Sequence, residues 1–107
     1  GYINYLEAWN KKGAIWGASH QGFTLAATTN LGEKARYIID SAPFKHGKFA
    51  PSSHLPIVPP DYFMDNPVDA IVITAPGYTD EIAASIRDKF GKNVEIRAMR
   101  SNHLELV

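Results

Sequence analysis

The chain contains no cysteine, which excludes disulfide bonds, thiolate catalysis and cysteine-ligated zinc together. It lacks any apolar run near the roughly 18 residues of a membrane span, and nothing at its start resembles a signal peptide. The chain has no net charge, because 11 basic and 11 acidic side chains cancel. No overall electrostatic field therefore favours nucleic acid or a membrane as a partner, and we expect a cytoplasmic protein.

The composition that remains is typical of one folded domain. Of the 107 residues, 45% are hydrophobic and 21% are charged, which is enough apolar content to close a core. The chain begins at Gly1 without an initiator methionine. We therefore expect residues 1–107 to be a single domain cut from a longer protein.

Apolar, β-branched runs that alternate with helical patterns predict an α/β domain. The predicted strands are residues 14–18, 36–40, 55–58, 69–75 and 94–99. The predicted helices are residues 1–12, 21–30 and 79–90, with a helical turn at 60–64. Thr79 is expected to cap the last helix, and Gly91 to end it.

This alternation predicts right-handed crossovers, a mainly parallel sheet and helices on both faces. The strand at 55–58 is bracketed by prolines and should lie at an edge, whereas the almost continuously apolar strand at 69–75 should be central. In such sheets ligands bind beyond the carboxyl ends of the strands. Residues 17–21, 40–45 and 75–78 should therefore converge on one crevice.

The turn from Gly17 to Gly22 is the most informative motif. Its glycines match the first and third glycines of the dinucleotide-binding fingerprint. The second glycine of the fingerprint lets a pyrophosphate approach the backbone, and Ser19 replaces it here. Asp40 falls about where a ribose-binding acid would lie. Two interpretations stay open, namely dinucleotide binding, and a Rossmann-like turn that binds something else or nothing.

The loop at 41–54 carries cationic and imidazole groups, and a loop of this length in a small domain usually has a function. His46 and His54 lie on it, and His20 lies in the glycine turn. Three histidines could ligate a metal, but their spacing shows no pairing, so we expect no metal and hydrogen-bonding histidines instead. Lys45 either offers a cation to a phosphate or belongs to a solvated charged loop.

Four groups of residues carry a resemblance to a known family. They are Gly17-Ala18 followed by Gly22, Thr24 and Leu25; Asp40-x-x-Pro43-x-Lys45-x-Gly47-x-x-x-Pro51-x-x-His54-x-Pro56; Asp69-Ala70-Ile71-Val72-Ile73; and Asp80-Glu81-Ile82. Together they resemble the C-terminal domain of nucleotide-sugar C-methyltransferases, which are S-adenosylmethionine-dependent enzymes of deoxysugar biosynthesis. The proline-, lysine- and histidine-containing series is the most specific part.

The resemblance implies a Rossmann-like three-layer sandwich with a mainly parallel five-stranded sheet. It also implies that this domain helps bind a nucleotide-diphospho sugar and holds no cofactor, while S-adenosylmethionine binds a missing upstream methyltransferase domain of the same chain. Two positions depart from the family pattern. Gln21 replaces a lysine, and Pro76-Gly77 replaces a tryptophan–asparagine pair, so the sugar-contact surface is expected to differ.

The predicted substrate-binding residues lie in the turn, at the end of the second predicted strand and on the loop that follows it. They are Gly17, Ser19, His20, Gln21, Gly22, Asp40, Lys45, His46 and His54. No catalytic residue can be named from the sequence. The alternatives are a stand-alone Rossmann-like nucleotide-sugar-binding or interaction module without catalysis of its own, and an NAD-dependent enzyme.

Overall fold

The computed structural model describes residues 12–19, 22–24, 35–51, 53–75, 77–100 and 103–107. Residues 1–11 of the helix predicted at 1–12 lie outside these ranges, as does most of the helix predicted at 21–30. Of the second helix, residues 22–24 are described, and they are helical.

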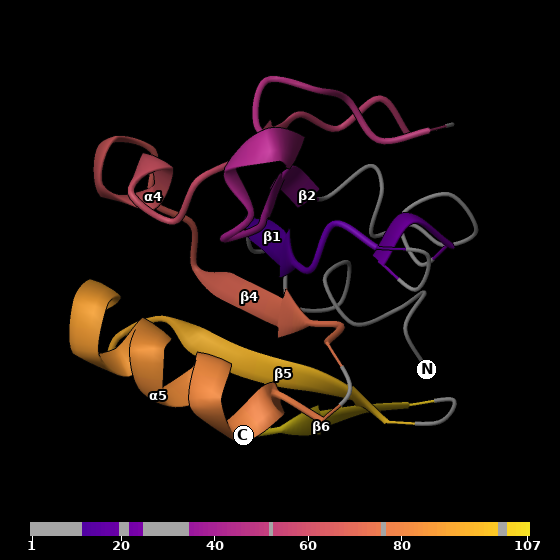
Figure 1. Ribbon diagram of the computed structural model, residues 1–107. Helices are drawn as coiled ribbons and strands as arrows, with labels where there is room; N and C mark the ends of the chain where they lie inside the picture. The colour runs from indigo at the N-terminus through magenta and orange to yellow at the C-terminus, as the bar shows by residue number, and fades with distance from the viewer. Residues whose placement is uncertain (1–11, 20–21, 25–34, 52, 76, 101–102) are drawn as a thin grey trace.

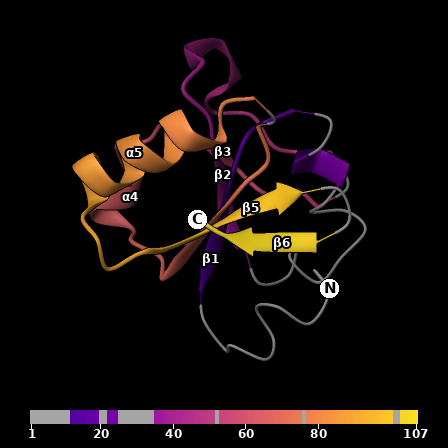
Figure 2. The ribbon, with the colours of Figure 1, turned by 90° about the horizontal axis from the view of Figure 1, so that it is seen from below.

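The strands form a single sheet in the order β3-β2-β1-β4-β5-β6. Their bounds are β1 (Gly13–Trp16), β2 (Ala35–Ile39), β3 (Ile57–Val58), β4 (Ala70–Ile73), β5 (Glu95–Arg100) and β6 (His103–Leu106). Strands β1 to β5 pair in parallel, whereas β6 runs antiparallel to β5 (Figure 2). The five predicted strands are confirmed, with β3 at an edge and β4 inside the sheet. The sixth strand was not predicted.

Two α-helices cover one face of the sheet, α4 (Tyr62–Asp65) and α5 (Thr79–Phe90), as both ribbon views show (Figures 1 and 2). The core on this face joins Trp16, Ile71 and Ile73 of the sheet to Phe63 of α4 and Ile86 of α5. Among the described residues, no helix is long and apolar enough to cross a bilayer.

The ends of α5 confirm one prediction and correct another. Gly91 follows the last helical residue with φ +90°, a backbone angle that side chains rarely allow. Thr79 is not the N-cap: Tyr78 occupies that position, no side chain caps the helix, and Thr79 is its first residue. The Thr79 side chain is buried rather than turned toward the free N–H groups, while Asp80 and Glu81 complement the helix dipole.

The opposite face of the sheet is covered differently. Ile15, Ile38 and Ile57 pack there against Ala50 and Leu55, which belong to the long loop between β2 and β3. Partly buried Phe23, from the helical residues 22–24, joins the same cluster. The sheet is therefore buried on both sides, as a parallel sheet requires.

The ionisation of Tyr37 is expected to lower the stability of this core at alkaline pH. Its buried hydroxyl donates a hydrogen bond to the carbonyl oxygen of Asn66 at 2.6 Å. Burial of the ring, with a smaller contribution from Tyr62, raises the pKa of Tyr37 to about 12. Because the unfolded chain loses this proton near pH 10, the unfolded state binds fewer protons than the folded state between pH 10 and pH 12, and stability falls as pH rises.

We expect this pH range to remove about 2 to 3 kcal/mol of unfolding free energy, which urea titrations at pH 9, 10 and 11.5 would measure. Tyr37→Phe should be less stable at neutral pH and should lose less stability across the same range. A slope as steep in Tyr37→Phe as in the wild type would show that another group is responsible.

Candidate functional site

The strand order reverses between β1 and β4: β2 and β3 follow on one side of β1, and β5 and β6 follow on the far side of β4. In open parallel sheets the carboxyl ends of two such strands leave a crevice where ligands bind. A cavity of about 340 Å³ lies at this point, and we call it the switch-point cavity. It is lined by Trp16, Gly17, Asp40, Ser41, Ala75, Tyr78, Glu81, Ile82 and Ser85.

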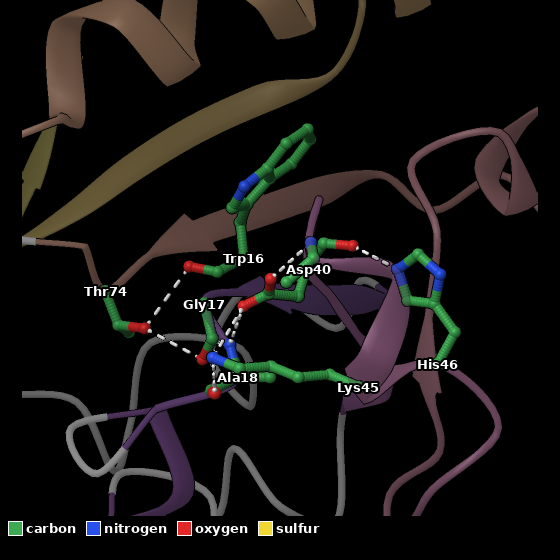
Figure 3. A network of polar contacts seen from close by, with 8 residues as sticks. Trp16, Gly17, Ala18, Asp40, Lys45, His46 and Thr74 are labelled. Atoms are coloured by element: carbon green, nitrogen blue, oxygen red, sulfur yellow. Dashed lines mark hydrogen bonds and ion pairs between the residues drawn. The ribbon is translucent and has the colours of Figure 1, made fainter.

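Gly17 turns the chain at the end of β1. Its φ is +132°, and a Cβ built on it would lie 2.5 Å from Oγ1 of Thr74. The Thr74 hydroxyl donates toward the carbonyl oxygens of Trp16 at 3.2 Å and Gly17 at 3.4 Å (Figure 3). The Gly17 N–H donates to the carbonyl oxygen of Ile39 at 2.8 Å. The turn is thus held between the ends of β2 and β4, and only glycine fits there.

Gly22 brings the following helical residues close to this turn. A Cβ on Gly22 would overlap the carbonyl oxygen of Gly17 and lie 3.0 Å from Oγ1 of Thr74. Gly17 and Gly22 therefore have the geometric roles of the first and third fingerprint glycines, the tight turn and the close helix–strand packing. Ser19, in the position of the second, is exposed, and its carbonyl oxygen accepts the N–H of Phe23 at 2.9 Å.

Asp40 connects the loops that follow β1 and β2. One carboxylate oxygen accepts the N–H of Ala18 at 2.9 Å, and the other accepts the N–H of Ala42 at 2.8 Å. Lys45 Nζ lies 3.6 Å from the first oxygen and donates to the carbonyl oxygen of Ala18 at 2.8 Å (Figure 3). Both oxygens of Asp40 are thus engaged within the protein, although its side chain also borders the cavity.

The histidines predicted for the site divide between two places. Nε2 of His46 contacts the carbonyl oxygen of Asp40 at 2.5 Å, so His46 belongs to the network around that residue (Figure 3). His54 is exposed with φ +60°, and its N–H donates to Ala50 in the turn at the tip of the loop. His20 lies outside the described residues, as does Gln21. Within the described ranges, no three histidine or acidic side chains are grouped as a metal site requires.

The structure therefore brings together Gly17, Asp40, Lys45 and His46, of which Gly17 and Asp40 line the cavity itself. The sequence analysis did not predict that residues at the start of α5 line the switch-point cavity. Tyr78, Glu81, Ile82 and Ser85 line it, and their spacing of three, one and three residues places them on one helical face. That spacing could have been recognised in the sequence. Glu81 also lies in the first turn of the helix, where its charge complements the helix dipole.

The charged side chains at the switch-point cavity have one sign. Asp40 and Glu81 are the acids among its described lining residues, which include no lysine, arginine or histidine. Carboxylates accept hydrogen bonds from hydroxyl groups and repel phosphate. The cavity is consequently suited to a hydroxylated, uncharged ring rather than to a phosphate group.

This strand order, the glycine turn and the acid after β2 define the chain as a Rossmann-like α/β domain. The crystal structure of UDP-D-quinovosamine 4-dehydrogenase from Vibrio fischeri is similar, with a TM-score of 0.72 and 19% identity over 91% of this chain and 93% of that chain. A search of curated proteins found no match. The family model described as "C-methyltransferase C-terminal domain" matches residues 1–96, and the chain belongs to this family. The predicted family and fold are thereby confirmed.

Proposed function

We propose that this domain binds the nucleotide-sugar substrate of an S-adenosylmethionine-dependent C-methyltransferase. Membership of the C-methyltransferase C-terminal domain family supports the connection to methyl transfer. In this proposal S-adenosylmethionine and the groups that catalyse methyl transfer belong to a methyltransferase domain that precedes this one in the same chain. The domain described here contributes substrate binding and no catalytic residue.

The observation that carries the proposal is the chemistry of the switch-point cavity. Glu81, Ser41 and Ser85 offer oxygen atoms that can pair with hydroxyl groups, and the Tyr78 side chain, 61% exposed, offers an aromatic face. Pockets for small polar ligands combine an apolar wall with a few such groups. The lining groups therefore suit the hydroxyl groups and the apolar face of a sugar or ribose ring.

The diphosphate of such a ligand requires positive charge, which the described lining residues of the cavity do not provide. Lys45 is the nearest candidate because its ammonium group lies beside Asp40 and its side chain is 31% exposed. An ammonium group has three donors, of which one is bonded to the carbonyl oxygen of Ala18, while Asp40 at 3.6 Å forms an ion pair. We propose that another donor of Lys45 pairs with a phosphate oxygen, with His46 adjacent.

A dinucleotide cofactor fits these residues less well. Ser19 places a side chain where the pyrophosphate of a dinucleotide would approach the backbone. Asp40, in the position of a ribose-binding acid, already accepts two backbone N–H groups. The geometry therefore favours a nucleotide sugar over NAD.

Isothermal titration calorimetry with a thymidine-diphospho sugar tests the proposal. Glu81→Ala removes a hydrogen-bond acceptor from the cavity, and we expect binding to weaken about tenfold, the usual effect of losing a hydrogen bond to a charged group. Asp88→Ala is the matched control, because Asp88 is an exposed acid on the same helix that does not line the cavity. Equal affinities in the two variants, or no binding at millimolar ligand, would contradict the proposal.

A further inference from the structure

A second cavity, of about 390 Å³, lies at the opposite end of the strands. It is lined by Lys12, Arg36, Tyr37, Tyr62, Asn66, Pro67 and Val68, and we call it the amino-end cavity. Lys12 immediately precedes β1, and Arg36 is the second residue of β2. The four residues of β1 span about 13 Å, and none of the described lining residues is common to the two cavities, so they are separate sites.

Among the residues that the structure describes, the charged ones that line the amino-end cavity are a lysine and an arginine, and none is acidic. In the part of the chain that the structure describes, neither cationic side chain has an ion pair or hydrogen bond. The neighbouring carboxylate of Asp69 accepts the backbone N–H of Lys12 at 3.2 Å and is not part of the lining. Two cationic side chains without a partner among the described residues thus line this cavity, whereas the charged side chains described at the switch-point cavity are acidic.

The remaining walls are apolar or donate hydrogen bonds. The rings of Tyr37 and Tyr62 meet edge to face, with centroids 4.9 Å apart. The Tyr37 hydroxyl is already bonded to Asn66. The exposed Tyr62 has a hydroxyl that can donate to a ligand, and Pro67 supplies an apolar surface beside it.

We propose that the amino-end cavity binds a small phosphorylated molecule. The guanidinium group of Arg36 can hold two phosphate oxygens at once, and Lys12 adds a second positive charge, a combination that favours a dianion. The carbon framework of the ligand packs against Tyr62 and Pro67, in a volume within the range of small-molecule sites. This site does not depend on the proposed nucleotide-sugar function.

Amide chemical-shift titrations at constant ionic strength test the site, with ribose 5-phosphate as the probe and ribose as its uncharged partner. We expect saturable shifts at Arg36, Asn66 and Val68 with ribose 5-phosphate, and none with ribose. Arg36→Gln should weaken binding about tenfold or more. Arg36→Lys keeps the charge but loses the bidentate geometry of the guanidinium group, so its affinity should lie between those of Arg36→Gln and the wild type. Lys92→Gln removes an exposed cation that does not line the cavity and should bind as the wild type does.

Several results would overturn the site. Shifts that never saturate, or equal affinities in Arg36→Gln and Lys92→Gln, would show that the phosphate senses only general charge. Saturable shifts confined to Ala18 and Lys45 would place the phosphate at the other end of the sheet. If Arg36→Gln does not give the wild-type spectrum outside the cavity, Lys12→Gln provides the same test and should weaken binding severalfold.

Discussion

Replacing Gly22 by alanine is expected to lower the free energy of unfolding by about 3 kcal/mol, close to the largest effects seen for single substitutions. The added methyl group would overlap the carbonyl oxygen of Gly17, which is backbone and cannot rotate away. The helical residues would have to move from the turn, or the turn would have to move from Thr74. Urea denaturation followed by circular dichroism measures the loss.

Gly47→Ala separates this clash from the general cost of replacing a glycine. Gly47 has φ +81°, but a Cβ there meets nothing within 4 Å, so its replacement should cost only about 1 to 2 kcal/mol of backbone strain. Gly22 has no such backbone angle, and its cost should come from the overlap alone. A smaller loss in Gly22→Ala than in Gly47→Ala would mean that the turn is looser than described.

The second large effect is expected at Asp40. Asp40→Asn keeps an oxygen that can accept the N–H of Ala42, but it turns an amide donor toward the N–H of Ala18 and the ammonium group of Lys45. The N–H of buried Ala18 would lose its acceptor. We expect a loss of about 2 to 4 kcal/mol in unfolding free energy, measured by the same urea titration.

Asp61→Asn is the control for the loss of a negative charge. The Asp61 carboxylate pairs with Lys89 at 2.5 Å, but its side chain is 78% exposed, and exposed pairs contribute about 1 kcal/mol or less. If Asp40→Asn cost no more than Asp61→Asn, Asp40 would not connect the two loops. The residue would then be free to act solely on a ligand.

Much of the fold was predictable because local patterns agreed with the tertiary structure. The apolar run at Ala70–Ile73 is buried on both faces of the sheet, so nothing in its environment interrupts the pattern. Pro56 and Pro59 lack the N–H groups that a central strand needs, which placed Ile57–Val58 at an edge. Gly17 and Gly22 were recognised by spacing alone, and backbone geometry explains both.

Other features depend on which neighbours the fold supplies. Strand β6 is four residues long and pairs antiparallel with β5, the strand just before it. No helical pattern separates the two strands in the sequence, so the alternation of strands and helices did not predict β6. The sequence position of Asp40 indicated a ligand group, but whether its oxygens are already bonded depends on Ala18 and Ala42, which only the folded loops bring near. His54 was assigned to the crevice because it shares a loop with Lys45. The loop instead carries it to its own exposed turn.

If the crevice at the carboxyl ends of β1 and β4 binds the sugar nucleotide, amide chemical shifts should locate the ligand there. On addition of a thymidine-diphospho sugar, we expect saturable shifts at Gly17, Ser41 and Tyr78, which line the switch-point cavity. The amide of Lys45 should shift with them. Saturable shifts elsewhere, with these four amides unchanged, would show that the crevice does not bind the sugar nucleotide.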